Sequence, residues 1–96
     1  MGKSNGIRFA ELAALLRRFG YALDPEQSAE DHFTFRHPDR PLRIILPAYR
    51  DNTAVQAVHL AVVRHVLTDG DPAEAREFEA WLDGRVSLDA GGVPVR

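Results

Sequence analysis

The chain has 96 residues, a net charge of −2 and no cysteine. This length suits one small domain with a single hydrophobic core, and the missing cysteines exclude disulfides, thiolate metal ligands and a cysteine nucleophile. The negative net charge argues against a nucleic-acid binder held by bulk electrostatics, but the basic residues gather in the first half of the chain, where any polyanion site is expected.

Residues 1–6 are polar and contain glycine, so we expect a disordered N terminus. This segment lacks the apolar core of a signal peptide, and no stretch of the sequence reaches the length of a membrane span. We therefore expect a cytoplasmic protein that does not contact a membrane.

Apolar residues recur at helical spacing from Ile7 and predict a first helix that ends at Gly20, a residue that readily takes the left-handed conformation closing a helix. The short alternating segment that follows, residues 21–24, predicts an edge strand. Pro25 ends this strand because proline cannot donate a hydrogen bond to a ladder. Residues 26–30 are polar and predict a loop.

The next segment predicts a β-hairpin, because apolar and polar residues alternate over residues 32–36 and again over residues 42–46. The sequence His-Pro-Asp-Arg-Pro between them is typical of a turn. If the turn pairs Arg36 with Arg43, Phe33 lies beside Leu46 and Phe35 beside Ile44, on a face that helices can cover. The opposite, open face then carries His32, Thr34, Arg36, Arg43 and Ile45.

Two further helices are expected after the hairpin. The first spans about residues 53–68, with Asn52 or Thr53 as its cap, and the second begins with Asp71 as cap and Pro72 in the first position. The apolar stripe of the first comprises Val55, Val58, His59, Val62, Val63 and Val66.

The last helix has an apolar face formed by Ala75, Phe78, Trp81 and Leu82. Phe78 and Trp81 either complete the core or form an exposed patch through which two copies associate as a homodimer. Residues 84–96 have no clear pattern and predict a flexible C-terminal tail.

The predicted order is helix, three strands, helix, helix. It indicates an α+β fold, a two-layer sandwich in which helices cover one face of a three-stranded antiparallel sheet. The other face is open to solvent unless a partner covers it. Residues 7–83 form the single predicted domain.

His32 is the candidate catalytic residue, because an imidazole at a strand start on the open face can accept or donate a proton at neutral pH. Arg36 and Arg43 on the same face can stabilise the transition-state charge of a phosphodiester. The alternatives are an ordinary surface histidine and solvated arginines. His59 and His65 do not share a face suited to metal ligation, so we expect neither a metal nor a cofactor.

The same residues resemble the HicA-type (YcfA-like) toxins of bacterial toxin–antitoxin modules. The resemblance covers about residues 7–68. The motifs that carry it are Phe9-x-x-Leu12-x-x-x-Leu16 running into Phe19-Gly20-Tyr21, His32-x-x-Phe35-x-His37-Pro38, and Leu46-Pro47.

The resemblance implies a double-stranded-RNA-binding-like fold with an additional C-terminal helix. It also implies an mRNA interferase, an endoribonuclease that uses His32 and is inhibited by a HicB-like antitoxin. Arg36, Arg43 and Arg50 are the candidate RNA-binding residues.

Glu30 and Asp31 stand where the family motif has Gly-Ser. Two carboxylates at this position repel phosphate, and Asp31 is expected to raise the pKa of His32. The alternative function is therefore a HicA-like module that binds RNA or a protein without cleaving RNA.

Overall fold

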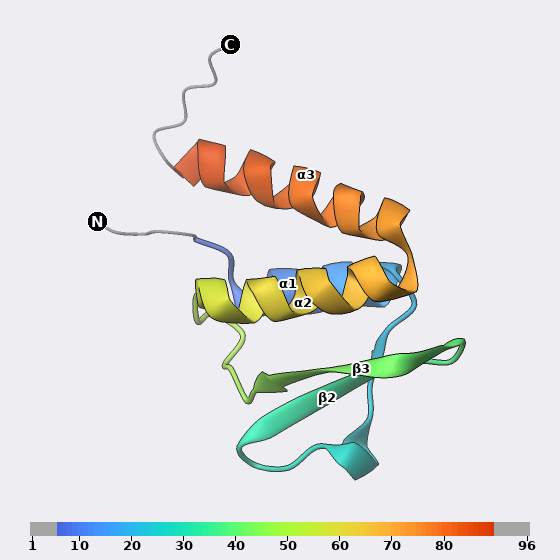
Figure 1. Cartoon of the computed structure of the whole chain (residues 1–96). Coiled ribbons are helices and arrows are strands. Elements are labelled where there is room, and N and C mark those ends of the chain that lie inside the picture. The colour runs from blue at the N-terminus through green and yellow to red at the C-terminus, as the bar shows by residue number, and fades with distance from the viewer. Residues whose placement is uncertain (1–5, 90–96) are drawn as a thin grey trace.

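A three-stranded antiparallel sheet forms the base of the protein, and its strands lie side by side in the order in which they occur along the chain (Figure 1). The computed structural model describes residues 6–89, with side chains described to Gly84. The elements are α1 (Phe9–Arg18), β1 (Ala22–Leu23), the 3-10 turn η1 (Pro25–Gln27), β2 (His32–His37), β3 (Arg40–Pro47), α2 (Ala57–Gly70) and α3 (Pro72–Asp89).

Helices α1 and α2 cover one face of the sheet, and α3 packs against α2 on the side away from the sheet (Figure 1). The predicted α+β class, with helices over one sheet face, is thus confirmed. The position of α3 adds a layer to the two that the sequence indicated. In the described part of the chain, no helix combines the length and apolar character needed to cross a membrane.

The predicted hairpin register is confirmed where the apolar residues alternate, since Phe33 pairs with Leu46 and Phe35 with Ile44. The predicted pairing of Arg36 with Arg43 is not among the strand pairs, because the register shifts between Phe35 and His37. Both strands also run further than predicted, and only two residues remain for the turn.

The start of α2 was predicted too early. Residues 53–55 form a backbone bridge with the segment before α1, in which Phe9 N–H donates to the Thr53 carbonyl and Val55 N–H donates to the Ile7 carbonyl. The helix therefore begins at Ala57, and its N-cap residue, Gln56, makes no side-chain capping bond. This bridge holds the chain entering α2 against the chain entering α1.

The buried stripe of α2 is also rotated from the predicted one. Leu60, Val63, Val66 and Leu67 are its buried residues. Val58 and Val62, which were predicted to face the core, are 59% and 38% exposed. The reason is that α2 packs against α3 as well as against the sheet. Val58 and Val62 lie on the part of the helix surface that neither α3 nor the sheet covers.

The C-terminal helix reaches Asp89, so the predicted tail, residues 84–96, begins inside α3, and only residues 90–96 lie outside the described part. Phe78 is fully buried, and Trp81 is partly buried and stacks on it. The core interpretation is confirmed for Phe78, which offers no surface to a second copy. The predicted disordered segment, residues 1–6, lies outside the described part except for Gly6.

A partly buried ion pair joins the hairpin tip to α3 and was not foreseen from the sequence. Arg40 donates to both carboxylate oxygens of Glu74, at 2.7 and 3.1 Å, and to the Tyr21 hydroxyl at 3.4 Å. The Glu74 carboxylate raises the pKa of Arg40 far above its ordinary value. Bidentate pairs of this kind are among the stronger polar contacts, so α3 is fixed to the sheet end as well as to α2.

Candidate functional site

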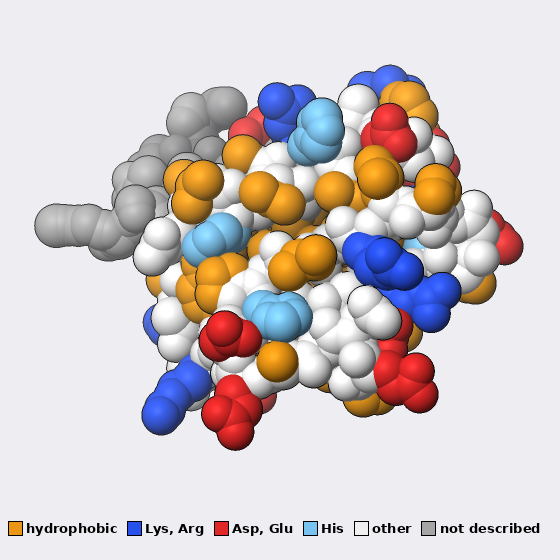
Figure 2. Space-filling model, turned by 60° about the horizontal axis from the view of Figure 1, so that its bottom comes forward, with side chains coloured by type: hydrophobic (Ala, Val, Ile, Leu, Met, Phe, Trp, Pro, Cys, Tyr) orange, Lys and Arg blue, Asp and Glu red, His pale blue; other side chains and the backbone are white. Residues whose placement is uncertain are grey.

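The four candidate residues all belong to the hairpin region. His32 begins β2 opposite Pro47, Arg36 lies further along β2, Arg43 lies in β3, and Arg50 follows β3. Figure 2 views the protein from the sheet side, where histidines lie among hydrophobic side chains and basic side chains are spread over several parts of the surface. The contacts of each candidate determine what this face can do.

Both ring nitrogens of His32 are engaged. Nδ1 lies 2.9 Å from a carboxylate oxygen of Asp31, and Nε2 lies 3.1 Å from the Gln27 carbonyl oxygen. Both partners are acceptors, so the ring satisfies them fully only when it is protonated on both nitrogens. The hydrogen bond to Asp31, followed by that to Gln27, raises the pKa of His32, as the sequence led us to expect for Asp31.

The segment before β2 covers part of the face that was expected to be open. The Thr34 hydroxyl donates to the Gln27 carbonyl at 2.8 Å, and the Thr34 N–H donates to the Ser28 hydroxyl oxygen at 3.0 Å. Thr34 is therefore buried, with 2% exposure, and its predicted place on an open surface is wrong. The Gln27 carbonyl thus holds both Thr34 and His32.

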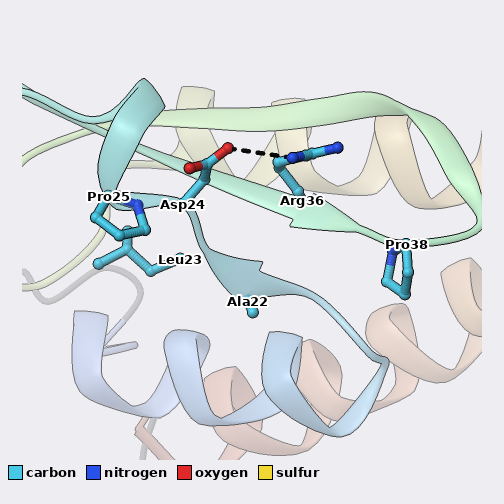
Figure 3. Close-up of a pocket in the computed structure, with 6 residues that line it drawn as sticks. All are labelled: Ala22, Leu23, Asp24, Pro25, Arg36 and Pro38. Atoms are coloured by element: carbon cyan, nitrogen blue, oxygen red, sulfur yellow. Dashed lines mark hydrogen bonds and ion pairs between the residues drawn. The ribbon is translucent and has the colours of Figure 1, made fainter.

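Arg36 is paired with a carboxylate from the neighbouring strand segment. Its guanidinium lies 3.5 Å from Asp24, beside a shallow hollow of about 360 Å³ (Figure 3). The hollow is lined by Ala22, Leu23, Asp24, Pro25, Arg36 and Pro38. Because the Arg36 side chain is more than half exposed, this pair contributes little stability, but it does neutralise the positive charge.

Arg43 and Arg50 are exposed and make no ion pair with the residues that the structure describes. Of the four candidate cations, two are each matched by an aspartate and two are available. The structure therefore keeps the candidate residues in one region of the fold but does not leave a lone imidazole flanked by unpaired guanidinium groups.

A tyrosine–histidine pair lies where β3 ends and α2 begins. The Gln56 N–H donates to the Tyr49 oxygen at 3.0 Å, and the Tyr49 hydroxyl is hydrogen-bonded to Nδ1 of His59. His59, which the sequence placed in the apolar stripe of this helix, is partly buried, and nothing in the sequence pattern indicated Tyr49 as its hydrogen-bond partner. Within the described residues, no group of three potential metal ligands comes together.

Comparison of the chain with protein-family models, with curated proteins and with solved structures gave no match. The geometry of the site is therefore the basis on which a function can be argued.

The His32–Asp31 pair predicts a specific pH dependence of stability. The raised pKa of His32 means that its contribution is complete below the ordinary histidine pKa and is lost as pH rises through the raised value. The same hydrogen bond lowers the pKa of Asp31, whose contribution is lost as pH falls through the lowered value.

Asp31→Asn is therefore expected to reduce stability most between these two pKa values, and less on either side of that window. Urea unfolding of the wild type and the variant over a pH series measures this difference. A loss of stability that is independent of pH would contradict the proposed ionic contact.

Proposed function

We propose that this chain is a HicA-like RNA-binding module in which His32 contributes positive charge and does not act as a general base. The observation that carries the proposal is the engagement of both His32 ring nitrogens by acceptors, Asp31 and the Gln27 carbonyl. A general base must offer an unprotonated nitrogen to the 2′-hydroxyl of RNA. An imidazolium held by two acceptors offers none.

The remaining cations suit contacts with the RNA backbone. Arg43 and Arg50 are exposed and unpaired within the described residues, so their guanidinium groups are available to phosphate. Arg36 would first have to leave Asp24, which makes it a weaker candidate. Few available cations and an acidic net charge predict weak binding with a shallow salt dependence.

An endoribonuclease of the HicA type is the second candidate function, with mRNA as substrate and a HicB-like antitoxin as partner. The observation in its favour is the exposure of the His32–Asp31 pair, whose side chains are 39% and 88% accessible. An exposed pair can open when a phosphate approaches. His32 could then donate its proton to the leaving oxygen as a general acid.

RNA binding is tested with a fluorescent single-stranded RNA at low and moderate salt. We expect measurable affinity at low salt, and in Arg43→Ala/Arg50→Ala a slope of log affinity against log salt that is shallower by about 2. Arg76→Ala, an exposed arginine on α3, is the matched control and should bind like the wild type. Absence of binding at low salt would refute the RNA-binding proposal.

Cleavage of the same RNA separates the two candidates. Wild-type protein is expected to leave the RNA intact, whereas Glu30→Gly/Asp31→Ser frees Nδ1 of His32 and is expected to introduce cleavage. Adding His32→Ala to that variant should abolish the gain. If the wild type cleaves RNA and His32→Ala does not, the endoribonuclease is the correct function.

A further inference from the structure

The hollow beside the short strand β1 combines apolar walls with a single charged pair. Its volume of about 360 Å³ lies at the lower end of the range found for small-ligand sites. Leu23, which forms one apolar wall, is 46% exposed, so this wall is accessible to a ligand. The space is here called the β1 hollow and is lined by Ala22, Leu23, Asp24, Pro25, Arg36 and Pro38.

The charged pair of the β1 hollow joins a largely buried carboxylate to an exposed guanidinium. The Asp24 side chain is 13% exposed, and its two oxygens accept hydrogen bonds from the Glu26 N–H at 3.0 Å and from Nη1 of Arg36 at 3.5 Å. The Asp24 N–H donates to the Thr34 carbonyl, which fixes this backbone to β2. Asp24 therefore orients Arg36 and offers little surface of its own to a ligand.

One side of the Arg36 guanidinium is available. Nη1 contacts Asp24, whereas no group among the described residues bonds to Nε or Nη2. The ion pair lies between Pro25 and Leu23 at one end of the hollow and Pro38 at the other (Figure 3). The N–H groups of Nε and Nη2 are parallel and form a fork that suits two neighbouring acceptor atoms. The β1 hollow thus places a two-donor edge next to apolar surface.

The charge balance of the β1 hollow disfavours a phosphate. Asp24 cancels the charge of Arg36, so a phosphate would place its negative charge beside a carboxylate without a net positive charge to attract it. A neutral planar group leaves the ion pair intact and covers the apolar wall formed by Leu23. In RNA, the neutral planar groups are the bases. Single-stranded RNA presents them unstacked, with their edges open to hydrogen bonding.

We propose that the β1 hollow binds one unstacked guanine base, with Nε and Nη2 of Arg36 donating to the two acceptors on its Hoogsteen edge. This inference rests on the proposed RNA-binding function and adds a base preference to it. Guanine carries a ring nitrogen and a carbonyl oxygen side by side on this edge, which is the pattern that the arginine fork matches. Adenine has a donor in place of the carbonyl oxygen, and the pyrimidines lack the ring nitrogen, so none of them accepts both hydrogens.

The base preference is measured with short fluorescent uridine strands at low salt that differ only in one central nucleotide. The wild type is expected to bind the strand with guanosine about 10-fold more tightly than the strand with adenosine. A third strand carries 7-deazaguanosine, which has carbon in place of the ring nitrogen, and should lose most of this preference. Equal binding of the guanosine strand and either of the others overturns the guanine proposal and leaves the RNA-binding function standing.

Arg36→Lys tests the fork itself, because lysine keeps the charge but cannot present two parallel donors. The ratio of the affinities for the guanosine and adenosine strands is expected to fall to about 1. Arg76→Lys, on the exposed surface of α3, is the matched control and should keep the wild-type ratio. Circular dichroism checks that both variants are folded. An unchanged ratio in Arg36→Lys contradicts the assignment of Arg36.

A free nucleotide tests the β1 hollow separately from RNA binding. Guanosine monophosphate, adenosine monophosphate and inorganic phosphate are each titrated into isotope-labelled protein and followed by NMR. We expect guanosine monophosphate to shift the amide signals of Ala22, Leu23 and Arg36 more than the other two do. Equal shifts with phosphate, or no shift with guanosine monophosphate, overturn the proposal. If guanosine monophosphate shifts these signals but no RNA binds, the guanine site stands and the RNA-binding function fails.

Discussion

Phe78→Ala is expected to destabilise the protein by about 3–5 kcal/mol, the loss typical of removing a buried aromatic ring. Phe78 has no exposed surface and stacks on Trp81 with ring centroids 6.0 Å apart. Phe78 belongs to the hydrophobic core together with Ala75 of the same helix, so removing its ring leaves a cavity among closely packed side chains. The midpoint and slope of urea unfolding measure the change.

Val58→Ala is the control for that measurement, because it removes apolar atoms from a 59% exposed side chain on the neighbouring helix. Its effect should stay within about 0.5 kcal/mol. A loss below about 1 kcal/mol for Phe78→Ala would mean that α3 is an appendage and not part of the core.

Gly20→Ala is expected to cost about 2 kcal/mol or more, for two reasons. Gly20 has φ of +96°, a conformation that is unfavourable for residues with a side chain. A Cβ atom at this position would also lie 2.7 Å from Nε2 of His37. His37 is held in place by a hydrogen bond from the Asp39 N–H and by an edge contact with Tyr21, so it cannot move away freely.

Gly84→Ala provides the opposite result with the same chemical change. Gly84 lies within α3, and a Cβ there would meet nothing within 4 Å. This substitution should stabilise the protein by up to about 1 kcal/mol, because alanine favours a helix more than glycine does. Equal effects of the two substitutions would show that the backbone conformation of Gly20 is not what requires glycine.

The sequence predicted the hairpin well because period-two alternation determines both the face and the register of a strand. Phe35 pairs with Ile44 as expected. Gly20 was also predicted correctly, since a glycine after an amphipathic stripe has a local physical reason. These features depend on residues close together in the chain.

The start of α2 and the environment of Thr34 depend on distant backbone groups and were not predictable in this way. Thr53 was a reasonable cap by composition, but its carbonyl accepts a hydrogen bond from Phe9. Thr34 alternates correctly with its neighbours, yet the segment around Gln27 folds over it. Alternation gives the face of a strand but not what covers that face.

The candidate site was predictable in part for the same reason. Asp31 is adjacent to His32, so its effect on the imidazole could be expected from the sequence. The second acceptor, the Gln27 carbonyl, and the neutralisation of Arg36 by Asp24 required the course of the chain between β1 and β2. Because of these two contacts, we expect His32 to contribute positive charge to this face of the sheet and not to abstract a proton.

The protonation state of the His32 ring at neutral pH tests this account most directly. Long-range nitrogen–proton NMR correlation distinguishes an imidazolium from either neutral tautomer, and Asp31→Asn identifies the contribution of the carboxylate. We predict that both ring nitrogens of His32 carry a proton in the wild type and that the variant shifts the ring toward the neutral form. A wild-type ring with one unprotonated nitrogen at neutral pH would contradict the proposed role of His32 as a positively charged group held by two acceptors.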